Sequence, residues 1–212
     1  MKPLNLLVFL LVALSSCALR IYKADDFDQA LAIHRTIAIL PAEVTMQLRP
    51  NQARSMGDEA MRALQRRTSR DVQEKINGWF LRRGDRLRYT VSFQDVITTN
   101  TKLKDAGISY EDLSATDRTK LAGILGVDAV LQCRMVMEKP MSEGVSAALG
   151  VVTGFWGATN RVAATVNTHD GTTGTLLWQY DNTYTGSVLN SNFQLVNALM
   201  RNMSSRFPYN AR

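Results

Sequence analysis

The sequence predicts an α/β fold, a mixed β-sheet with helices packed on it, in the order β-α-β-α-β-β-β-α. Three features indicate this class. Residues 36–41 form an apolar run of strand length, residues 52–83 follow with helical periodicity, and a tight turn at residues 170–174 joins two alternating segments. Elements in this order pack as layers around one core. At 212 residues, 45% hydrophobic and 21% charged, the chain is expected to form a single globular domain.

The first expected strand, residues 36–41, is apolar on both of its alternating faces. A strand of this kind lies in the centre of a sheet that is covered on both sides. Pro41 ends the strand, because proline has no N–H to donate to a sheet ladder.

Residues 52–83 predict a long helix, with a cap at residues 55–58 and a stop at Gly84. Its apolar stripe recurs at three- and four-residue steps and consists of Met61, Leu64, Val72, Ile76, Trp79 and Phe80. The opposite face carries four basic residues, Arg66, Arg67, Arg70 and Lys75. They form either a solvated helix face or a basic patch that contacts phosphate or a partner.

Residues 88–98 alternate and predict a half-exposed strand, with Val91, Phe93 and Ile97 turned inward. The threonine-rich residues 98–101 are typical of a loop.

A connector with a helical turn is expected at residues 102–115. A capping pattern at residues 114–117 then predicts a short helix, which Gly126 ends.

Residues 127–137 predict a strand whose inward face includes Cys133, which we interpret as a small core residue rather than a nucleophile. Residues 161–168 and 176–184 predict an antiparallel hairpin around the turn at 170–174. A last helix is expected after Asn190 or Ser191, with Pro208 beyond its end. Its apolar stripe is Phe193, Val196, Leu199 or Met200, and Met203.

The N-terminus has the layout of a secretory signal, with Lys2, an apolar run over residues 4–14 and then small residues. Leu14-Ser15-Ser16-Cys17 resembles a bacterial lipobox, so we expect residues 1–16 to be a signal peptide and Cys17 to carry lipid. One alternative is an uncleaved membrane anchor, but the run is shorter than the roughly 20 residues that a spanning helix needs. The other is an ordinary cleavage site beside an incidental cysteine.

The expected mature chain has three parts. Residues 17–35 are a lipidated tether, residues 36–207 are the α/β domain, and residues 208–212 are a C-terminal tail. Anchoring through Cys17 places the protein in a bacterial cell envelope. The absence of aspartate directly after Cys17 favours the outer membrane, with the domain facing the periplasm.

No catalytic, metal or cofactor site is expected. The two histidines, His34 and His169, lie far apart, and no HExxH, CxxC, GxSxG or phosphate-loop pattern occurs. With Cys17 lipidated, Cys133 has no partner for a disulfide. The net charge of +6 suits contact with lipid phosphates or anionic cell-wall polymers, but many soluble domains carry such a charge with no such partner. We expect no nucleic-acid partner.

Residues 141–160 are rich in glycine and apolar side chains and carry one acidic residue. They predict a packed loop, a membrane-touching flap or a subunit contact. We expect Val151, Phe155 and Trp156 to form a partner surface there.

Residues 37–41, 125–131 and 170–178, together with the lipobox, resemble envelope lipoproteins of the broad CsgG/LpoB-like group. This group includes the curli secretion channel, the lipoprotein activator of a peptidoglycan synthase and many uncharacterised lipoproteins. Its core is similar to the N-terminal domain of TolB. The likeness is greatest to the uncharacterised lipoproteins, whose last residues also read like Phe207-Pro208-Tyr209.

The resemblance implies two functions. One is a non-catalytic binding module for an envelope protein or the peptidoglycan machinery. The other is a subunit of an oligomeric ring used in outer-membrane export, so homo-oligomerisation stays open. Pore-forming inserts alternate strictly between polar and apolar residues, whereas residues 147–152 do not alternate. The sequence therefore favours the binding module.

Overall fold

The computed structural model describes residues 20–47, 57–138, 160–186 and 192–210. In these residues one sheet of seven strands runs in the order β1-β7-β6-β5-β2-β4, and β3 also pairs with β5. The strands are β1 (Arg20–Lys23), β2 (Thr36–Ile39), β3 (Glu43–Gln47), β4 (Ser92–Phe93), β5 (Ala129–Glu138), β6 (Asn160–Asp170) and β7 (Leu176–Gly186). The helices are α2 (Phe27–Ile33), α4 (Asp58–Leu87), α5 (Val96–Asp105), α6 (Arg118–Leu125) and α8 (Asn192–Ser204).

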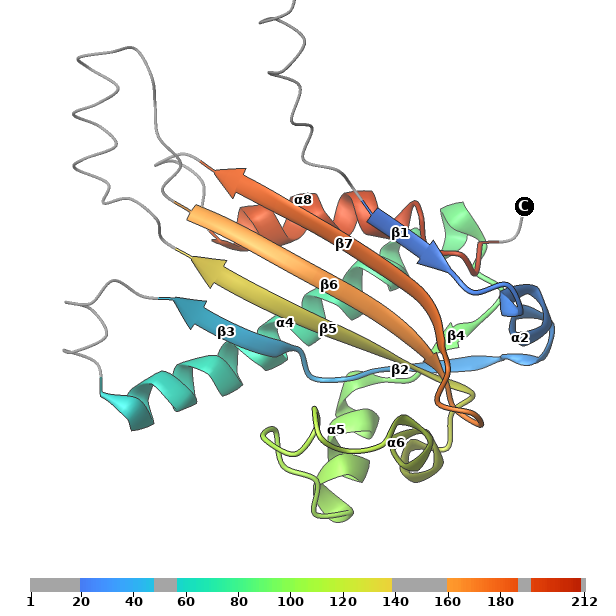
Figure 1. Cartoon of the computed structure of the whole chain (residues 1–212), viewed down its shortest axis with the longest axis horizontal. Coiled ribbons are helices and arrows are strands. Elements are labelled where there is room, and N and C mark those ends of the chain that lie inside the picture. Colours follow the sequence, from blue (N-terminus) through green and yellow to red (C-terminus); the bar gives the residue numbers. More distant parts are fainter. Residues whose placement is uncertain (1–19, 48–56, 139–159, 187–191, 211–212) are drawn as a thin grey trace, which may run out of the picture.

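The sheet has helices on both faces. Figure 1 shows α4 and α8 crossing behind the sheet, with α5 and α6 at the end where β5 begins. Ile37 and Ile39 lie in the core that α4 and α8 cover, whereas Ala38 and Leu40 lie in the smaller core under α5 and α6. The expected mixed sheet, and a first strand buried on both sides, are therefore confirmed.

The hairpin of β6 and β7 and the strand β5 are also confirmed. β5 pairs in parallel with β2 and antiparallel with β6, so the sheet is mixed. Cys133 is fully buried on the face of β5 that α4 and α8 cover. Burial raises the pKa of its thiol to about 12, and the buried thiol is a core group rather than a nucleophile.

Two expected element boundaries are wrong. The strand predicted at 88–98 is only two residues long, and the loop predicted at 98–101 lies inside α5. The Asp95 carboxylate caps α5 by accepting the Thr98 N–H at 2.9 Å, so capping outweighs the low helix propensity of the threonines. Ile97 therefore lies on the solvent side of the helix, 76% exposed, rather than facing inward.

The helix α4 continues through Gly84 to Leu87. It ends at Arg88, which adopts a left-handed φ of 48° while its N–H donates to the Gly84 carbonyl. The residue before the helix is Gly57, and Ser55 of the expected cap lies outside the described residues. The helix does not end at Gly84, because its packing against the sheet and α8 stabilises it beyond this residue.

The domain extends beyond both expected limits. Residues 17–35 were expected to be a tether, but Arg20–Lys23 pairs antiparallel with β7, and Phe27 of α2 is 1% exposed. Residues 208–212 were expected to be a tail, but Tyr209 is fully buried. Both segments complete the core, because their aromatic rings pack edge to face with centroids 5.2 Å apart.

Gly171, in the hairpin turn, approaches another backbone too closely for any side chain. Its N–H donates to the Asp128 carbonyl at 2.7 Å, and an added Cβ would lie 2.7 Å from that oxygen. We expect Gly171→Ala to lower the free energy of unfolding by about 1–3 kcal/mol in urea titration. The matched control is Gly123→Ala in α6, where nothing lies within 4 Å of an added Cβ and alanine favours the helix. Equal stability of the two variants would contradict the close contact.

Candidate functional site

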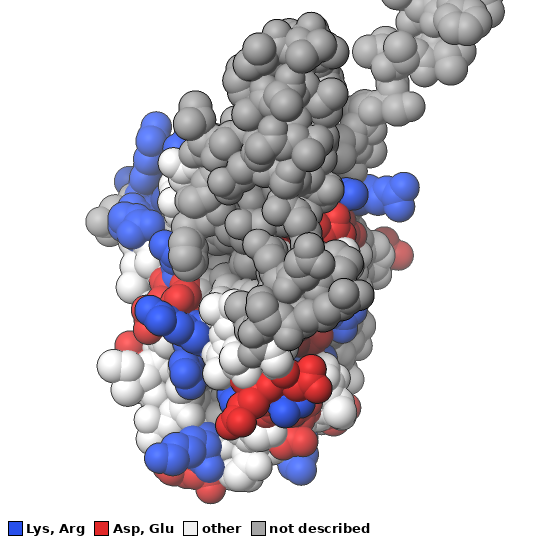
Figure 2. All heavy atoms as spheres, turned by 90° about the vertical axis from the view of Figure 1, so that its left-hand side faces the viewer, with Lys and Arg blue, Asp and Glu red and all other residues white. Residues whose placement is uncertain are grey.

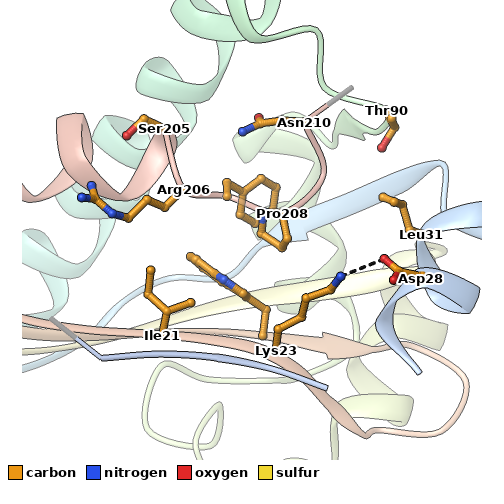
Figure 3. A pocket seen from close by; sticks show the side chains of 11 residues that line it. Ile21, Lys23, Asp28, Leu31, Thr90, Ser205, Arg206, Pro208 and Asn210 are labelled. Carbon is orange, nitrogen blue, oxygen red and sulfur yellow. Dashed lines mark hydrogen bonds and ion pairs between the residues drawn. The ribbon is translucent and has the colours of Figure 1, made fainter. Parts of the chain in front are cut away.

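A groove lies beside the edge strand β1. It has a volume of about 700 Å³ and lies between β1, α2 and the C-terminal residues 205–210. Figure 3 shows Ile21 and Lys23 on the strand side of the groove, with Ser205, Arg206 and Pro208 facing them from the C-terminal segment. The groove therefore lies between segments that come from the two ends of the described chain.

The floor of the groove is apolar, and polar side chains join apolar ones in its walls. Trp178 of β7 and Phe207 line it with their rings in edge-to-face contact at 5.5 Å, and both residues are buried. Ile21 stays 46% exposed at the open side. An apolar hollow with a few polar groups around it is the usual form of a binding site.

The two ends of the groove differ in charge. Arg206 lies at the end beside Ile21, whereas Asp28 lies at the other end and forms a 2.8 Å ion pair with Lys23 (Figure 3). The Asp28–Lys23 pair is close to neutral, so the positive charge of Arg206 favours a ligand with an acidic group at its end of the groove.

A buried polar cluster holds the groove walls in place. His34 Nδ1 lies 2.7 Å from the Tyr209 hydroxyl, and His34 Nε2 lies 2.9 Å from the Asp170 carboxylate. Burial, followed by the nearby negative charge of Asp170, raises the pKa of Tyr209, so its hydroxyl stays protonated. The cluster links the N-terminal segment, the hairpin turn and the C-terminus, and we assign it a structural role.

Asp170 receives hydrogen bonds from several directions. Burial alone raises the pKa of its carboxyl, but hydrogen bonds from the Thr173 N–H and hydroxyl, from His34 and from the Thr172 N–H hold that pKa below the ordinary value of 3.8. The sequence predicts only a turn at Asp170, because its contact with His34 joins residues 136 positions apart.

The lowered pKa of Asp170 predicts acid sensitivity. A carboxyl with a depressed pKa contributes stability that is complete above the unfolded-state pKa, near 3.8, and is lost as pH falls through the folded-state pKa. We expect Asp170→Asn to be less stable than the native protein by roughly 1–3 kcal/mol at pH 7. The difference should shrink as the pH falls below about 4 and through the folded-state pKa, in chemical denaturation at each pH. A difference independent of pH would contradict this role of the carboxylate.

The predicted basic residues do not form one patch. Arg66 forms a 2.9 Å ion pair with Glu111, and Arg66 and Arg70 border a shallow hollow against α5. Lys75 is nine residues beyond Arg66, which places it on roughly the opposite side of α4, near Asn197 of α8. Arg67 is exposed on the same helix. Figure 2 shows Lys and Arg side chains spread down one side of this end of the molecule, with Asp and Glu among them.

The other predicted site residues, Cys17, Val151, Phe155 and Trp156, lie outside the described residues. Within the described ranges, no group of three or more His, Cys, Asp or Glu side chains could hold a metal ion. Among the same residues, no helix is long and apolar enough to cross a membrane. The sequence does not predict the groove, and its one local sign there is the terminal motif Phe207-Pro208-Tyr209.

Comparisons with known proteins find likeness in fold. No protein-family profile and no curated protein matches the sequence. Among solved structures, the chain is similar to the PelC dodecamer from Paraburkholderia phytofirmans, with 14% identity, 92% of this chain and 98% of that chain covered, and a TM-score of 0.50. The lipoprotein GNA1162 from Neisseria meningitidis is 17% identical over 81% of this chain and 94% of its own, with a TM-score of 0.43.

The LpoB C-terminal domain from Salmonella enterica is 14% identical over 76% of this chain and 93% of its own, with a TM-score of 0.38. At 14% identity and a TM-score of 0.50, the likeness to PelC concerns the fold alone.

Proposed function

We propose that this protein is a lipid-anchored lipoprotein of the bacterial envelope that acts as a non-catalytic docking module, with the groove beside β1 as its docking surface. The observation that carries the proposal is the groove itself, an apolar hollow of about 700 Å³ with charged ends. Its partner is an envelope protein, and the peptidoglycan synthesis machinery is one source of such partners.

The anchor and the groove are close in the chain. Three residue steps separate Cys17 from Arg20 of β1, which limits the distance between the two residues to roughly 11 Å. Lipid on Cys17 would hold β1 near the membrane surface. A partner that presents a segment close to the membrane would then meet the groove.

Photocrosslinking in intact cells tests this proposal. A photoreactive residue replaces Ser205, which is exposed and lines the groove, in the full-length lipoprotein. The control position is Ile97, 76% exposed on α5. We expect a discrete adduct from position 205 that is absent from position 97.

A pair of matched variants ties the adduct to the groove. Ile21→Lys changes a groove residue that is 46% exposed, and Tyr22→Lys changes its neighbour, 50% exposed on the opposite sheet face. The adduct should be lost with Ile21→Lys and kept with Tyr22→Lys. Identical adducts from positions 205 and 97, or retention with Ile21→Lys, would refute docking at the groove.

A second candidate function is that of a ring subunit in outer-membrane export. The likeness in fold to PelC, whose structure is named as a dodecamer, is the observation that favours it. The native mass of the lipoprotein separates the two functions.

A further inference from the structure

We infer that the groove binds its partner as an added β-strand, through an extended segment that pairs with the free edge of β1 and places alternate side chains in the hollow. This inference deepens the proposed function and rests on it. Strand addition to a sheet edge combines main-chain hydrogen bonds with pockets for alternate side chains.

One edge of β1 has backbone groups that point away from β7. In the described part of the chain, β1 is the last strand of the sheet and pairs with β7 alone. The Ala24 N–H donates to the Leu177 carbonyl at 2.9 Å, which fixes the register of the ladder. Hydrogen-bonded residues alternate along an antiparallel strand. Tyr22 therefore bonds to β7, whereas the N–H and C=O groups of Ile21 and Lys23 point to the free edge.

The same two residues border the groove. Ile21 and Lys23 lie opposite Tyr180 and Trp178, so their side chains share the face of the sheet that α4 and α8 cover. Residues of an added strand that pair with Ile21 and Lys23 would direct their side chains to that face as well. Two side chains, two residues apart, would then enter the hollow over Trp178 and Phe207.

The lining sets the chemistry of the bound segment. The aromatic floor suits apolar side chains at the two inserted positions. Arg206 favours an acidic residue at one end, because the cation at the other end, Lys23, is already paired with Asp28. The occupant is thus an extended protein segment with alternate apolar residues and an acidic residue beside Arg206.

Two synthetic peptides test the inference on the full chain in mild detergent. Each has eight residues that alternate valine and threonine, with aspartate at the amino end in one and at the carboxyl end in the other. We expect one of them to bind and to slow hydrogen exchange at the Ile21 and Lys23 amides by about tenfold or more. The Tyr22 amide, already bonded to β7, should keep its rate. The same peptide with N-methyl groups on its β1-facing amides should not bind.

Protein variants provide the second arm. Ile21→Pro removes one outward N–H and leaves the ladder to β7, a position where edge strands accept proline. We expect the peptide to bind this variant about tenfold or more weakly and Tyr22→Ala with less than about a twofold change. The N-methylated peptide keeps the test valid if Ile21→Pro fails to fold.

Three results would overturn strand addition. They are binding of neither peptide at about 1 mM, binding without protection of Ile21 and Lys23, and equal binding of the N-methylated peptide. Crosslinking from position 205 with unprotected β1 amides would show that docking occurs without an added strand. Failure of that crosslinking would instead refute the proposed function itself.

Discussion

Replacing Tyr209 with alanine should lower the free energy of unfolding by about 3–5 kcal/mol, the range for truncating a buried aromatic side chain. Tyr209 is fully buried, packs on Phe27 and Phe207 with ring centroids 5.2 Å from each, and contacts His34 Nδ1 through its hydroxyl at 2.7 Å. For a domain of this size we expect the melting temperature to fall by roughly 6–20 °C. Differential scanning calorimetry of the full chain measures the change.

Two controls separate the ring from the hydroxyl and from surface effects. Tyr209→Phe keeps the packing but leaves a buried His34 nitrogen without its partner, which should cost about 1–3 kcal/mol. Tyr22→Ala removes a tyrosine that is 50% exposed and should change stability by less than about 0.5 kcal/mol. A Tyr209→Ala variant as stable as Tyr22→Ala would show that residues 208–212 are a dispensable tail.

Replacing Cys17 with serine should abolish lipid attachment completely. The proposed anchor requires a thiol, and serine offers a hydroxyl of similar size in its place. Each buried methylene of a lipid chain contributes about 0.8 kcal/mol to membrane binding, and two or more chains hold a protein stably. Loss of the lipid therefore removes the main attachment of the mature chain.

Labelling with an alkyne-tagged fatty acid measures this prediction in cells. The full-length protein and Cys133→Ala should take up the label, and Cys17→Ser should not. Cys133 is a suitable control because it is fully buried in β5. Label on Cys17→Ser would refute Cys17 as the lipid site.

The parts of the fold that could be predicted are those with strong local periodicity. The hairpin of β6 and β7, the strand β5 and the helix α4 each carry a repeat of two or of three to four residues along their own sequence. Boundaries were less predictable, because α5 depends on one cap at Asp95 and α4 is held past Gly84 by its packing.

The groove could not be predicted from any single stretch. Arg20–Lys23 has no alternating apolar pattern that would indicate a strand, and all four of its residues are exposed in the structure. Its walls come from opposite ends of the chain, and the contact between His34 and Tyr209 spans 175 positions. The only local sign was the aromatic run at Phe207 and Tyr209, whose burial depends on Phe27 of α2.

The native mass of the full-length lipoprotein in mild detergent tests the central claim most directly. A docking module keeps the edge of β1 and the groove free, so light scattering with the detergent contribution subtracted should give the mass of one chain. A discrete assembly of about eight or more chains would contradict the account and favour the ring subunit.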